Sequence, residues 1–388
     1  MISYGKQLID DDDIDAVTRV LKSDFLTQGP VVQKFEHSLK EYFEAKHCCV
    51  VSNGTAALHL ASRALDWKKG DIILTSPITF LASANCIIYS GATPDFVDIN
   101  YSDYNIDINR LEEKILKYRK NGKNIKAVVA VDYSGYPCEW KELRYLANKF
   151  EFQLINDNCH SMGAKLNSDK AYAVKFADLV TQSYHPVKNF TSGEGGSVLT
   201  NNSEIDEKIR LLRSHGMIKG SKVSEKNNYP WYYEMHQIGF NYRLTDIHCA
   251  LGMSQLSKLD KFVKKRQEIA MCYNKSFKEY NYFKIPKINE MDSHSFHLYP
   301  FLIDFDYFEK NRKDFFEFMK NQGILLQVHY IPLYKQPYYK DNFGFIDSDF
   351  PNSEKFYRNE VSLPIHPGLS SSDQDRVIDC IFKFFNVK

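Results

Sequence analysis

The chain has 388 residues, and its 50 lysines and arginines against 49 aspartates and glutamates give a formal net charge of +1. With this balance the chain has no excess of positive charge that would attract nucleic acid. Its 43% hydrophobic and 26% charged residues are typical of a folded protein. No apolar run approaches the roughly 20 residues that cross a bilayer, and residues 10–13 are all aspartate where a signal peptide would be apolar. We therefore expect a cytoplasmic protein that binds no membrane and no nucleic acid.

The first half of the chain predicts helices and short buried strands in alternation. Two amphipathic helices are expected at the N-terminus, one after the acidic cluster at residues 10–13 and one over residues 32–42. Helices are also expected at residues 55–65 and 139–150. Apolar runs typical of strands buried on both faces occur at 48–51, 71–75, 94–99, 126–131, 152–156, 178–183 and 196–200. This order predicts a mostly parallel sheet covered by helices.

The second half of the chain has a different pattern. Residues 212–243 are polar and aromatic, which predicts a long surface or interface loop centred on residues 216–238. One long helix is expected to start near residue 245 and to run past residue 270, with strands near 297–303 and 324–330. We expect a large domain at residues 1–250 and a smaller C-terminal α/β domain at residues 251–388.

Four turns at predicted strand ends carry residues suited to chemistry, because parallel strands place their carboxyl ends at one edge of a sheet. Ser52–Ala57 opens a helix whose N–H groups suit a phosphate, although a tight structural turn is the alternative. Phe80 offers an aromatic ring. Asp157 follows a strand, with His160 one helical turn later, and could also be a helix cap. Lys188 precedes a glycine turn, where dry surroundings would free its amine to form a Schiff base; a solvated surface lysine is the alternative.

Longer motifs carry a resemblance to a known family. In order and spacing the chain resembles the pyridoxal-phosphate-dependent sugar aminotransferases of fold type I, which aminate keto sugars attached to nucleotides. The resemblance implies a large domain with a mostly parallel seven-stranded sheet flanked by helices, and a smaller C-terminal α/β domain. The motifs that carry it are FLTQGP (25–30), SNGTAALHLA (52–61), SPITFLASAN (76–85), NDNCHSMGA (156–164), SYHPVKNFTSGEGG (183–196), RSHGM (213–217), GFNYRLTDIHCALG (239–252), QVHYIPLY (327–334) and LPIHPGL (363–369).

The same resemblance implies a role for individual residues. Lys188 would join the cofactor pyridoxal 5'-phosphate covalently, Asp157 would hold its protonated pyridine nitrogen, and His160 would lie near its phenolic oxygen. Phe80 would cover the ring face. The resemblance also implies a homodimer with shared active sites, in which the cofactor's phosphate meets Gly54, Thr55, Ala56 and Ser183 of one chain and Asn241 of the other.

Within the family, the chain is most similar to the branch that serves pseudaminic acid biosynthesis. That branch transfers an amino group from L-glutamate to C4 of a UDP-linked 4-keto-6-deoxy-2-acetamido-hexose, which gives UDP-4-amino-4,6-dideoxy-N-acetyl-altrosamine. Two features depart from the pattern of the branch, Asn189 in place of proline and an aromatic stretch at residues 229–233. Another nucleotide-linked 4-keto sugar, of the UDP-bacillosamine or GDP-perosamine type, therefore stays open. The sugar nucleotide is expected to contact Tyr4, Thr27, Gln28, Tyr184, Arg243 and His329.

Other classes of protein fit the sequence less well. Tyr145 and Lys149 have the YxxxK spacing of nucleotide-sugar epimerases and dehydratases, but no GxGxxG follows the first strand. A metal-dependent hydrolase could use Asp157, Cys159 and His160, yet no second ligand pair stands at a matching turn, so no metal is expected. A non-catalytic regulator would not need Lys188 and Asp157, and the dehydrase branch of the family has histidine in place of the lysine.

Overall fold

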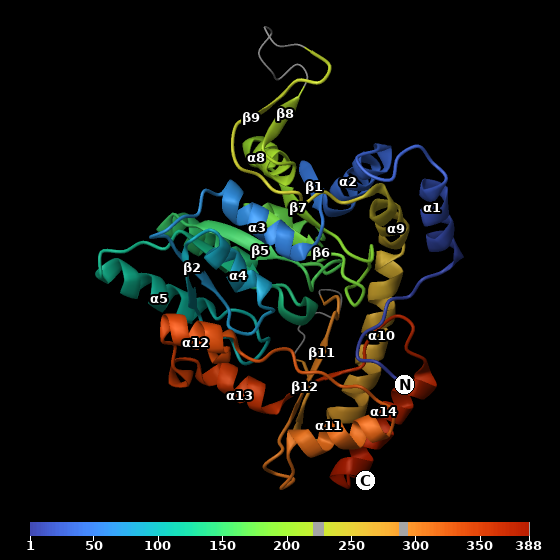
Figure 1. The fold of residues 1–388 in the computed structure, drawn as a ribbon. Helices are drawn as coiled ribbons and strands as arrows, with labels where there is room; N and C mark the ends of the chain where they lie inside the picture. Colours follow the sequence, from blue (N-terminus) through green and yellow to red (C-terminus); the bar gives the residue numbers. More distant parts are fainter. Residues whose placement is uncertain (220–228, 287–293, 388) are drawn as a thin grey trace.

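A seven-stranded sheet forms the centre of the larger part of the molecule (Figure 1). The computed structural model describes residues 1–219, 229–286 and 294–387. Strands β1 (His47–Val51) and β6 (Leu179–Ser183) pair antiparallel with β7 (Gly196–Thr200), and every other neighbouring pair is parallel. The predicted strands and the mostly parallel sheet are confirmed. In spatial order the strands are β1 (His47–Val51), β7 (Gly196–Thr200), β6 (Leu179–Ser183), β5 (Gln153–Asp157), β4 (Ala127–Val131), β2 (Ile72–Thr75) and β3 (Thr93–Phe96).

Helices cover both faces of this sheet, which is why its central strands are apolar at almost every position. In β4, Ala127 and Val129 belong to the core on one face, and Val128 and Ala130 belong to the core on the other. The first face is covered by α3 (Gly54–Ala64), α4 (Ala82–Tyr89) and α8 (Ser203–Arg213). The second face is covered by α2 (Pro30–Phe43), α5 (Ile108–Lys120), α6 (Trp140–Phe150) and α7 (Tyr172–Phe176).

The prediction of one long helix from residue 245 is wrong. The segment forms two helices, α9 (Asp246–Leu256) and α10 (Leu259–Phe277), separated by a two-residue turn at Ser257 and Lys258. The break lies where α9 packs on α1 (Asp11–Leu21), and Lys258 in the turn forms ion pairs with Asp10 and Asp13 at the start of α1. These tertiary contacts fix the turn at a point where the apolar periodicity of the sequence continues unbroken.

A second, smaller sheet lies beside α10 in the C-terminal region (Figure 1). It is antiparallel, in the order β10 (Phe283–Lys284), β11 (Tyr299–Ile303) and β12 (Glu360–Leu363). It shares a core with α10, α11 (Arg312–Asn321) and α14 (Ser371–Phe385), and Ile2 from the N-terminus joins that core. The domain boundary near residue 250 stays a prediction.

One of the two predicted C-terminal strands is confirmed and the other is wrong. The strand expected at residues 297–303 is β11. Residues 324–330 make only isolated bridges, Ile324 with Ile2 and Gln327 with Ser362. The backbone N–H of His329 bonds to the side chain of Glu360 instead of a neighbouring strand, so this segment cannot continue a ladder. It is followed by α12 (Pro337–Phe343) and α13 (Pro351–Asn359). Tyr339 of α12 packs on Phe96 of β3 and hydrogen-bonds Asn85 of α4, and α13 packs on β11.

The predicted surface loop contains a short hairpin. Strands β8 (Met217–Lys219) and β9 (Tyr233–Met235) pair antiparallel and project from the body of the molecule (Figure 1). Residues 220–228 of this predicted loop lie outside the described residues. Next to them Trp231 is 75% exposed and Met235 is 64% exposed. In the part of the chain that the structure describes, no helix is both long enough and apolar enough to cross a membrane.

Candidate active site

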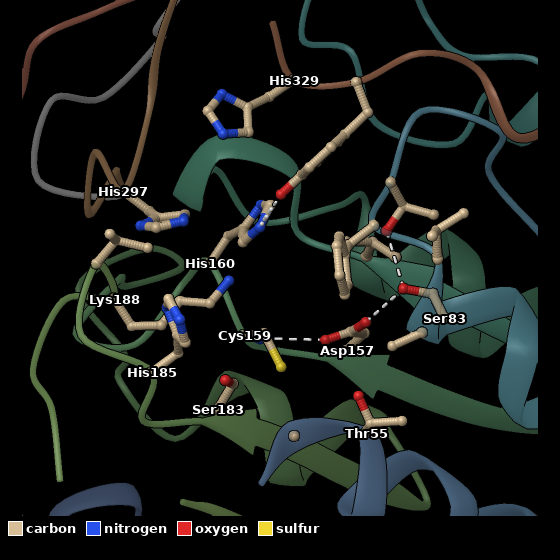
Figure 2. Close-up of a pocket in the computed structure, with 18 of the residues that line it drawn as sticks. Thr55, Ser83, Asp157, Cys159, His160, Ser183, His185, Lys188, His297 and His329 are labelled. Carbon is tan, nitrogen blue, oxygen red and sulfur yellow. Dashed lines mark hydrogen bonds between the residues drawn. The ribbon is translucent and has the colours of Figure 1, made fainter. Parts of the chain in front are cut away.

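A cavity of about 670 Å³ opens at the carboxyl ends of β5 and β6 (Figure 2). Turns that follow different strands and lie far apart in sequence form its walls, together with the N-terminal segment and the residues after Leu326. The parallel arrangement of the strands brings these turns to one edge. The predicted site residues among its walls are Tyr4, Gly54, Thr55, Phe80, Asp157, His160, Ser183, Lys188 and His329.

The start of α3 forms the side of the cavity next to Ser183. Asn53 caps the helix, and its side chain accepts the N–H of Ala56 at 2.7 Å. A Cβ atom on Gly54 would lie 2.7 Å from Cβ of Ser183, so only glycine allows this close approach. The N–H groups of Gly54 and Thr55 have no intrahelical acceptor and lie at the positive end of the helix, which suits an anion. Ala56 does not fit its predicted contact with the phosphate. Its N–H already donates to the side chain of Asn53, and Ala56 does not line the cavity.

Asp157 ends β5 and is only 4% exposed. Its Oδ2 accepts a hydrogen bond from Ser83 at 2.7 Å, and Ser83 lies 2.9 Å from the Thr79 hydroxyl; Oδ1 accepts the N–H of Cys159 at 3.3 Å (Figure 2). No ion pair among the described residues involves Asp157. A buried carboxylate with neutral partners only is stabilised by a ligand that brings positive charge.

Lys188 lies in the turn between β6 and β7 and faces the same space as Asp157 (Figure 2). No hydrogen bond or ion pair joins its amine to another described residue. Burial lowers the pKa of Lys188, although Cys159 and the Asp157 carboxylate oppose that shift. The lowered pKa increases the neutral fraction of the amine, which is the form that acts as a nucleophile or base.

His160 is 2% exposed, and only one of its two ring nitrogens has a hydrogen-bond partner. Nε2 lies 3.0 Å from the hydroxyl of Tyr330, whereas Nδ1 is buried without a hydrogen-bond partner. Burial, together with the nearby Lys188 amine, holds the pKa of His160 well below its usual value, so the ring is neutral. The ring of His297 lies 4.5 Å from it between centroids. A bound ligand with a polar atom next to Nδ1 of His160 would give this nitrogen the hydrogen-bond partner that it lacks.

Two aromatic pairs form the open side of the cavity. Phe80 is 53% exposed, and its ring centroid lies 6.2 Å from that of Tyr330. The Tyr4 ring lies 5.2 Å from the His329 ring, which places the N-terminal segment against the C-terminal region. Such rings suit flat ligands, because an aromatic face packs on a π-system without competing for its hydrogen bonds.

Besides Ala56 and Tyr184, four predicted residues do not line the cavity of their own chain. Thr27, Gln28 and Asn241 are exposed and Arg243 is half-buried. Thr27 forms an isolated backbone bridge to Thr245, and Asn241 forms one to Ser214. Their side chains can therefore act in a cavity only if a second chain brings them there.

Tyr184 does not fit its predicted contact with substrate. Its ring is fully buried between Phe35 and Phe190, and its hydroxyl hydrogen-bonds Gln182 and Ser197. It belongs to the core beneath the Lys188 turn. The Tyr145 and Lys149 pair, which an epimerase would use, lies away from the cavity. Tyr145 is 62% exposed, and neither residue lines the cavity.

Sequence reasoning missed several residues that hold the predicted ones. Ser83 and Thr79 support Asp157, and Tyr330 contacts His160. Thr79 lies in the turn between β2 and α4, and Ser83 lies in the first turn of α4, so their position after a strand end was a usable signal. Tyr330 has no comparable signal, because the segment that carries it follows no strand of the large sheet.

The chain belongs to the DegT/DnrJ/EryC1/StrS aminotransferase family. The family model matches residues 7–382. The chain is 42% identical to the UDP-4-amino-4,6-dideoxy-N-acetyl-beta-L-altrosamine transaminase of Campylobacter jejuni (strain 81-176), over 98% of this chain and 97% of that one. The predicted family is confirmed.

Solved structures give the same result for the fold. The Helicobacter pylori aminotransferase PseC, described as involved in the biosynthesis of pseudoaminic acid, is 35% identical with a TM-score of 0.91, and the match covers 100% of both chains. The sugar aminotransferase Spr1654 of Streptococcus pneumoniae, in its PMP-form, is 26% identical with a TM-score of 0.89, over 100% of this chain and 99% of that one. The α/β aminotransferase fold is confirmed.

Proposed function

We propose that this enzyme uses pyridoxal 5'-phosphate to transfer an amino group from L-glutamate to C4 of a UDP-linked 4-keto-6-deoxy-2-acetamido-hexose. The product is UDP-4-amino-4,6-dideoxy-N-acetyl-altrosamine, a precursor of pseudaminic acid. The observation that carries the proposal is the cavity itself, in which the buried Asp157 carboxylate and the unpaired Lys188 amine face one space beside the start of α3. The Campylobacter and Helicobacter relatives support the choice of sugar.

The chemistry of the cavity fits the cofactor at each of its polar groups. Gly54, Thr55 and Ser183 suit the phosphate, because free N–H groups and a hydroxyl meet at the positive end of a helix. Asp157 suits a protonated pyridine nitrogen, since its carboxylate has no cationic partner among the described residues. When bound, pyridoxal phosphate supplies a ring that accepts the electron pair released as a C–H bond breaks.

The residues of the chain then have distinct tasks. Lys188 holds the cofactor covalently at rest, and its amine moves the substrate proton as general base and acid, a task that its lowered pKa favours. Asp157 keeps the pyridine nitrogen charged, and Ser83 holds Asp157 in place by a hydrogen bond of 2.7 Å. His160 stays neutral and offers Nδ1 to the cofactor's phenolic oxygen, and Phe80 covers the ring face.

A homodimer with shared sites supplies charges that the cavity lacks. Among the described residues of its walls, Lys188 is the one lysine and no arginine is present, although the proposed substrates carry a diphosphate and two carboxylates. Asn241 and Arg243 of a partner chain would provide a phosphate contact and a bidentate guanidinium for the diphosphate. Large apolar side chains are exposed on two other segments, residues 25–26 and 231–238, and suit an interface: Phe25, Leu26, Trp231, Met235 and Ile238.

Two inactive variants test the shared site. Lys188→Ala and Asn241→Ala each damage a site, but in a mixed dimer one of the two sites receives both native residues. Equal mixing with full exchange should recover about a quarter of the wild-type activity, because half of the dimers are mixed and each has one intact site. Exchange is verified with two affinity tags. No recovery after verified exchange contradicts the shared site.

The reaction is tested with the purified enzyme, L-glutamate and a panel of UDP-linked and GDP-linked 4-keto sugars. We expect the UDP-linked 4-keto-6-deoxy-2-acetamido-hexose to be aminated, with the product identified by mass and the configuration at C4 by proton NMR. Amination of GDP-linked sugars alone would replace the proposal by a GDP-perosamine type of activity. Amination of none of the panel contradicts it.

A further inference from the structure

Three buried groups form a hydrogen-bonded chain behind the wall of the cavity. The Ser362 hydroxyl lies 2.6 Å from Oε1 of Glu360 and 2.8 Å from Nδ1 of His329. Oε2 of Glu360 accepts the backbone N–H of His329 at 3.0 Å. Glu360 and Ser362 are fully buried, whereas His329 lines the cavity, on the side opposite Ser183 and Thr55 in the view of Figure 2. Among the residues that the structure describes, none hydrogen-bonds Nε2 of His329.

The state of Glu360 decides which nitrogen of His329 carries the proton. An ionised carboxylate only accepts, so Ser362 must donate its single hydroxyl proton to Oε1. Ser362 then accepts from Nδ1–H of His329. The neutral ring is left with a lone pair on Nε2, which accepts hydrogen bonds from the cavity.

A protonated Glu360 reverses every bond of the chain. Its Oε2 already accepts a backbone N–H, so the carboxyl proton must be on Oε1 and must be donated to Ser362. Ser362 then donates its own proton to Nδ1 of His329. The ring proton moves to Nε2, which becomes a donor toward the cavity. One proton taken up at Glu360 therefore inverts the hydrogen-bonding role of a nitrogen at the other end of the chain.

We propose that Glu360, Ser362 and His329 form a proton relay whose protonated state makes Nε2 of His329 donate a hydrogen bond to an oxygen of the sugar nucleotide. Glu360 and Ser362 are positioning residues in this relay, because they act on the substrate only through the imidazole. The choice of the sugar nucleotide as the acceptor rests on the proposed function, but the relay itself does not.

The surroundings favour this relay over a charged imidazole. Burial raises the pKa of Glu360 to about 8 and lowers the pKa of His329 to about 3, so near neutral pH the proton is on the carboxyl and the ring is neutral. Arg312 donates a hydrogen bond to the carbonyl of Glu360, and its positive charge opposes the rise in the pKa of the Glu360 carboxyl. The other titratable groups near the relay are Lys188, two histidines and four tyrosines. Burial lowers the pKa of Lys188 and holds the pKa of His160 and His297 well below its usual value. Burial raises the pKa of the tyrosines, which are Tyr4, Tyr104, Tyr133 and Tyr330.

The first experiment observes the tautomer directly. The holoenzyme is labelled with ¹⁵N-histidine, and two-bond ¹H–¹⁵N spectra are recorded at pH 6.5 and pH 9.5, with the His329 signals assigned by their loss in His329→Gln. We expect the Nε2–H tautomer at low pH and the Nδ1–H tautomer at high pH. Glu360→Gln should hold Nε2–H at both pH values, because its amide donates to Ser362 as the protonated carboxyl does. A wild-type tautomer that does not change with pH overturns the relay.

The second experiment measures the effect on substrate. Between pH 7 and pH 9 the protonated fraction of a group with a pKa near 8 falls about tenfold, so KM for the UDP-linked 4-keto sugar should rise about tenfold relative to Glu360→Gln. Both enzymes retain Lys188, so its titration cancels when KM of the wild type is divided by KM of Glu360→Gln at each pH. Glu317→Gln, an exposed carboxylate on α11, is the matched control and should follow the wild type.

Ser362→Ala separates the proposed relay from a purely structural role of Glu360. Ser362→Ala breaks the chain between the carboxyl and the ring, so both tautomers should appear at every pH, and KM should rise at pH 7 with little change in kcat. If KM of the wild type and of Glu360→Gln keeps a constant ratio while the tautomer switches, the bond to substrate is refuted. If no sugar is aminated, the proposed function fails, and the NMR result still decides the relay.

Discussion

Removing the carboxylate of Asp132 should destabilise the fold and the site together. Asp132 follows β4 and is fully buried, with no ion pair to any described residue. Its Oδ1 accepts the N–H of Cys138 at 2.8 Å and the indole N–H of Trp140 at 2.9 Å. Its Oδ2 accepts the hydroxyls of Ser161 at 2.8 Å and Tyr172 at 2.7 Å. Ser161 belongs to the turn after β5, so this acceptor ties that turn to the core.

The size of the effect follows from which donors can find another partner. Asp132→Ala leaves a backbone amide and an indole N–H that cannot turn away, and two hydroxyls that can partly reorient. It also removes the acceptor of two longer bonds, from the side-chain amides of Asn156 at 3.3 Å and Asn158 at 3.4 Å. At about 1–3 kcal/mol for each buried donor left unsatisfied, the loss should be roughly 3–6 kcal/mol. Asp132→Asn keeps one carbonyl oxygen for the Cys138 and Trp140 donors, and its amide can donate to the hydroxyls. Its loss should be about 1–2 kcal/mol.

Urea unfolding of the apoenzyme, followed by circular dichroism, measures the free energy of unfolding of the wild type, Asp132→Asn and Asp132→Ala. Asp306→Asn is the control, since its exposed ion pair with Arg358 contributes little, below about 1 kcal/mol. We also expect Asp132→Ala to lower kcat more than Asp132→Asn, because Asp157 and His160 lie on the turn that Ser161 anchors. Equal midpoints for Asp132→Ala and the control would refute the reasoning.

Three further predictions concern the site. Borohydride reduction should place the mass of the cofactor on the peptide that contains Lys188, and Lys188→Ala should lose nearly all turnover; a label on another lysine would overturn its role. Tyr330→Phe, which removes the hydroxyl 3.0 Å from His160, should lower kcat about tenfold, equivalent to one hydrogen bond, at an unchanged melting temperature. Gly54→Ala should lower the melting temperature of the apoenzyme and the affinity for pyridoxal phosphate, because its Cβ would meet Ser183 at 2.7 Å; Ser183→Gly in the same chain should restore the melting temperature.

The large sheet could be predicted because local pattern and tertiary structure agree there. Each strand is a short apolar run, and helices cover both of its faces, so the burial of β4 or β5 is visible in its own residues. The C-terminal region lacks that agreement. Residues 324–330 have a strand-like composition, yet a side chain, Glu360, takes the N–H of His329 that a ladder would need. A contact with a residue about thirty positions away decided the structure.

The same distinction separates the site residues that sequence found from those that it missed. Asp157 ends β5 and Lys188 follows β6, which is the neighbouring parallel strand, so their meeting at one edge follows from topology. Tyr330 and Ser362 come from outside that sheet, and only the packing of the C-terminal region brings them to His160 and to the cavity wall. Tyr184 shows the opposite error, since its place beside a site motif says nothing of the direction in which its side chain points.

The proposed relay and the proposed dimer would address one physical problem, which is how a site with few cations binds substrates with several negative charges. Among the described residues the walls hold one lysine, and burial lowers the pKa of three histidines there, His160, His297 and His329. A neutral ring that donates a hydrogen bond attracts a phosphate or carbonyl oxygen without adding a charge that would lower the pKa of Lys188 further. In the proposed dimer, Arg243 of the partner chain would meet the diphosphate at a distance from the Lys188 amine. The charge that binds substrate would then lie apart from the amine, whose pKa has to stay low for the reaction.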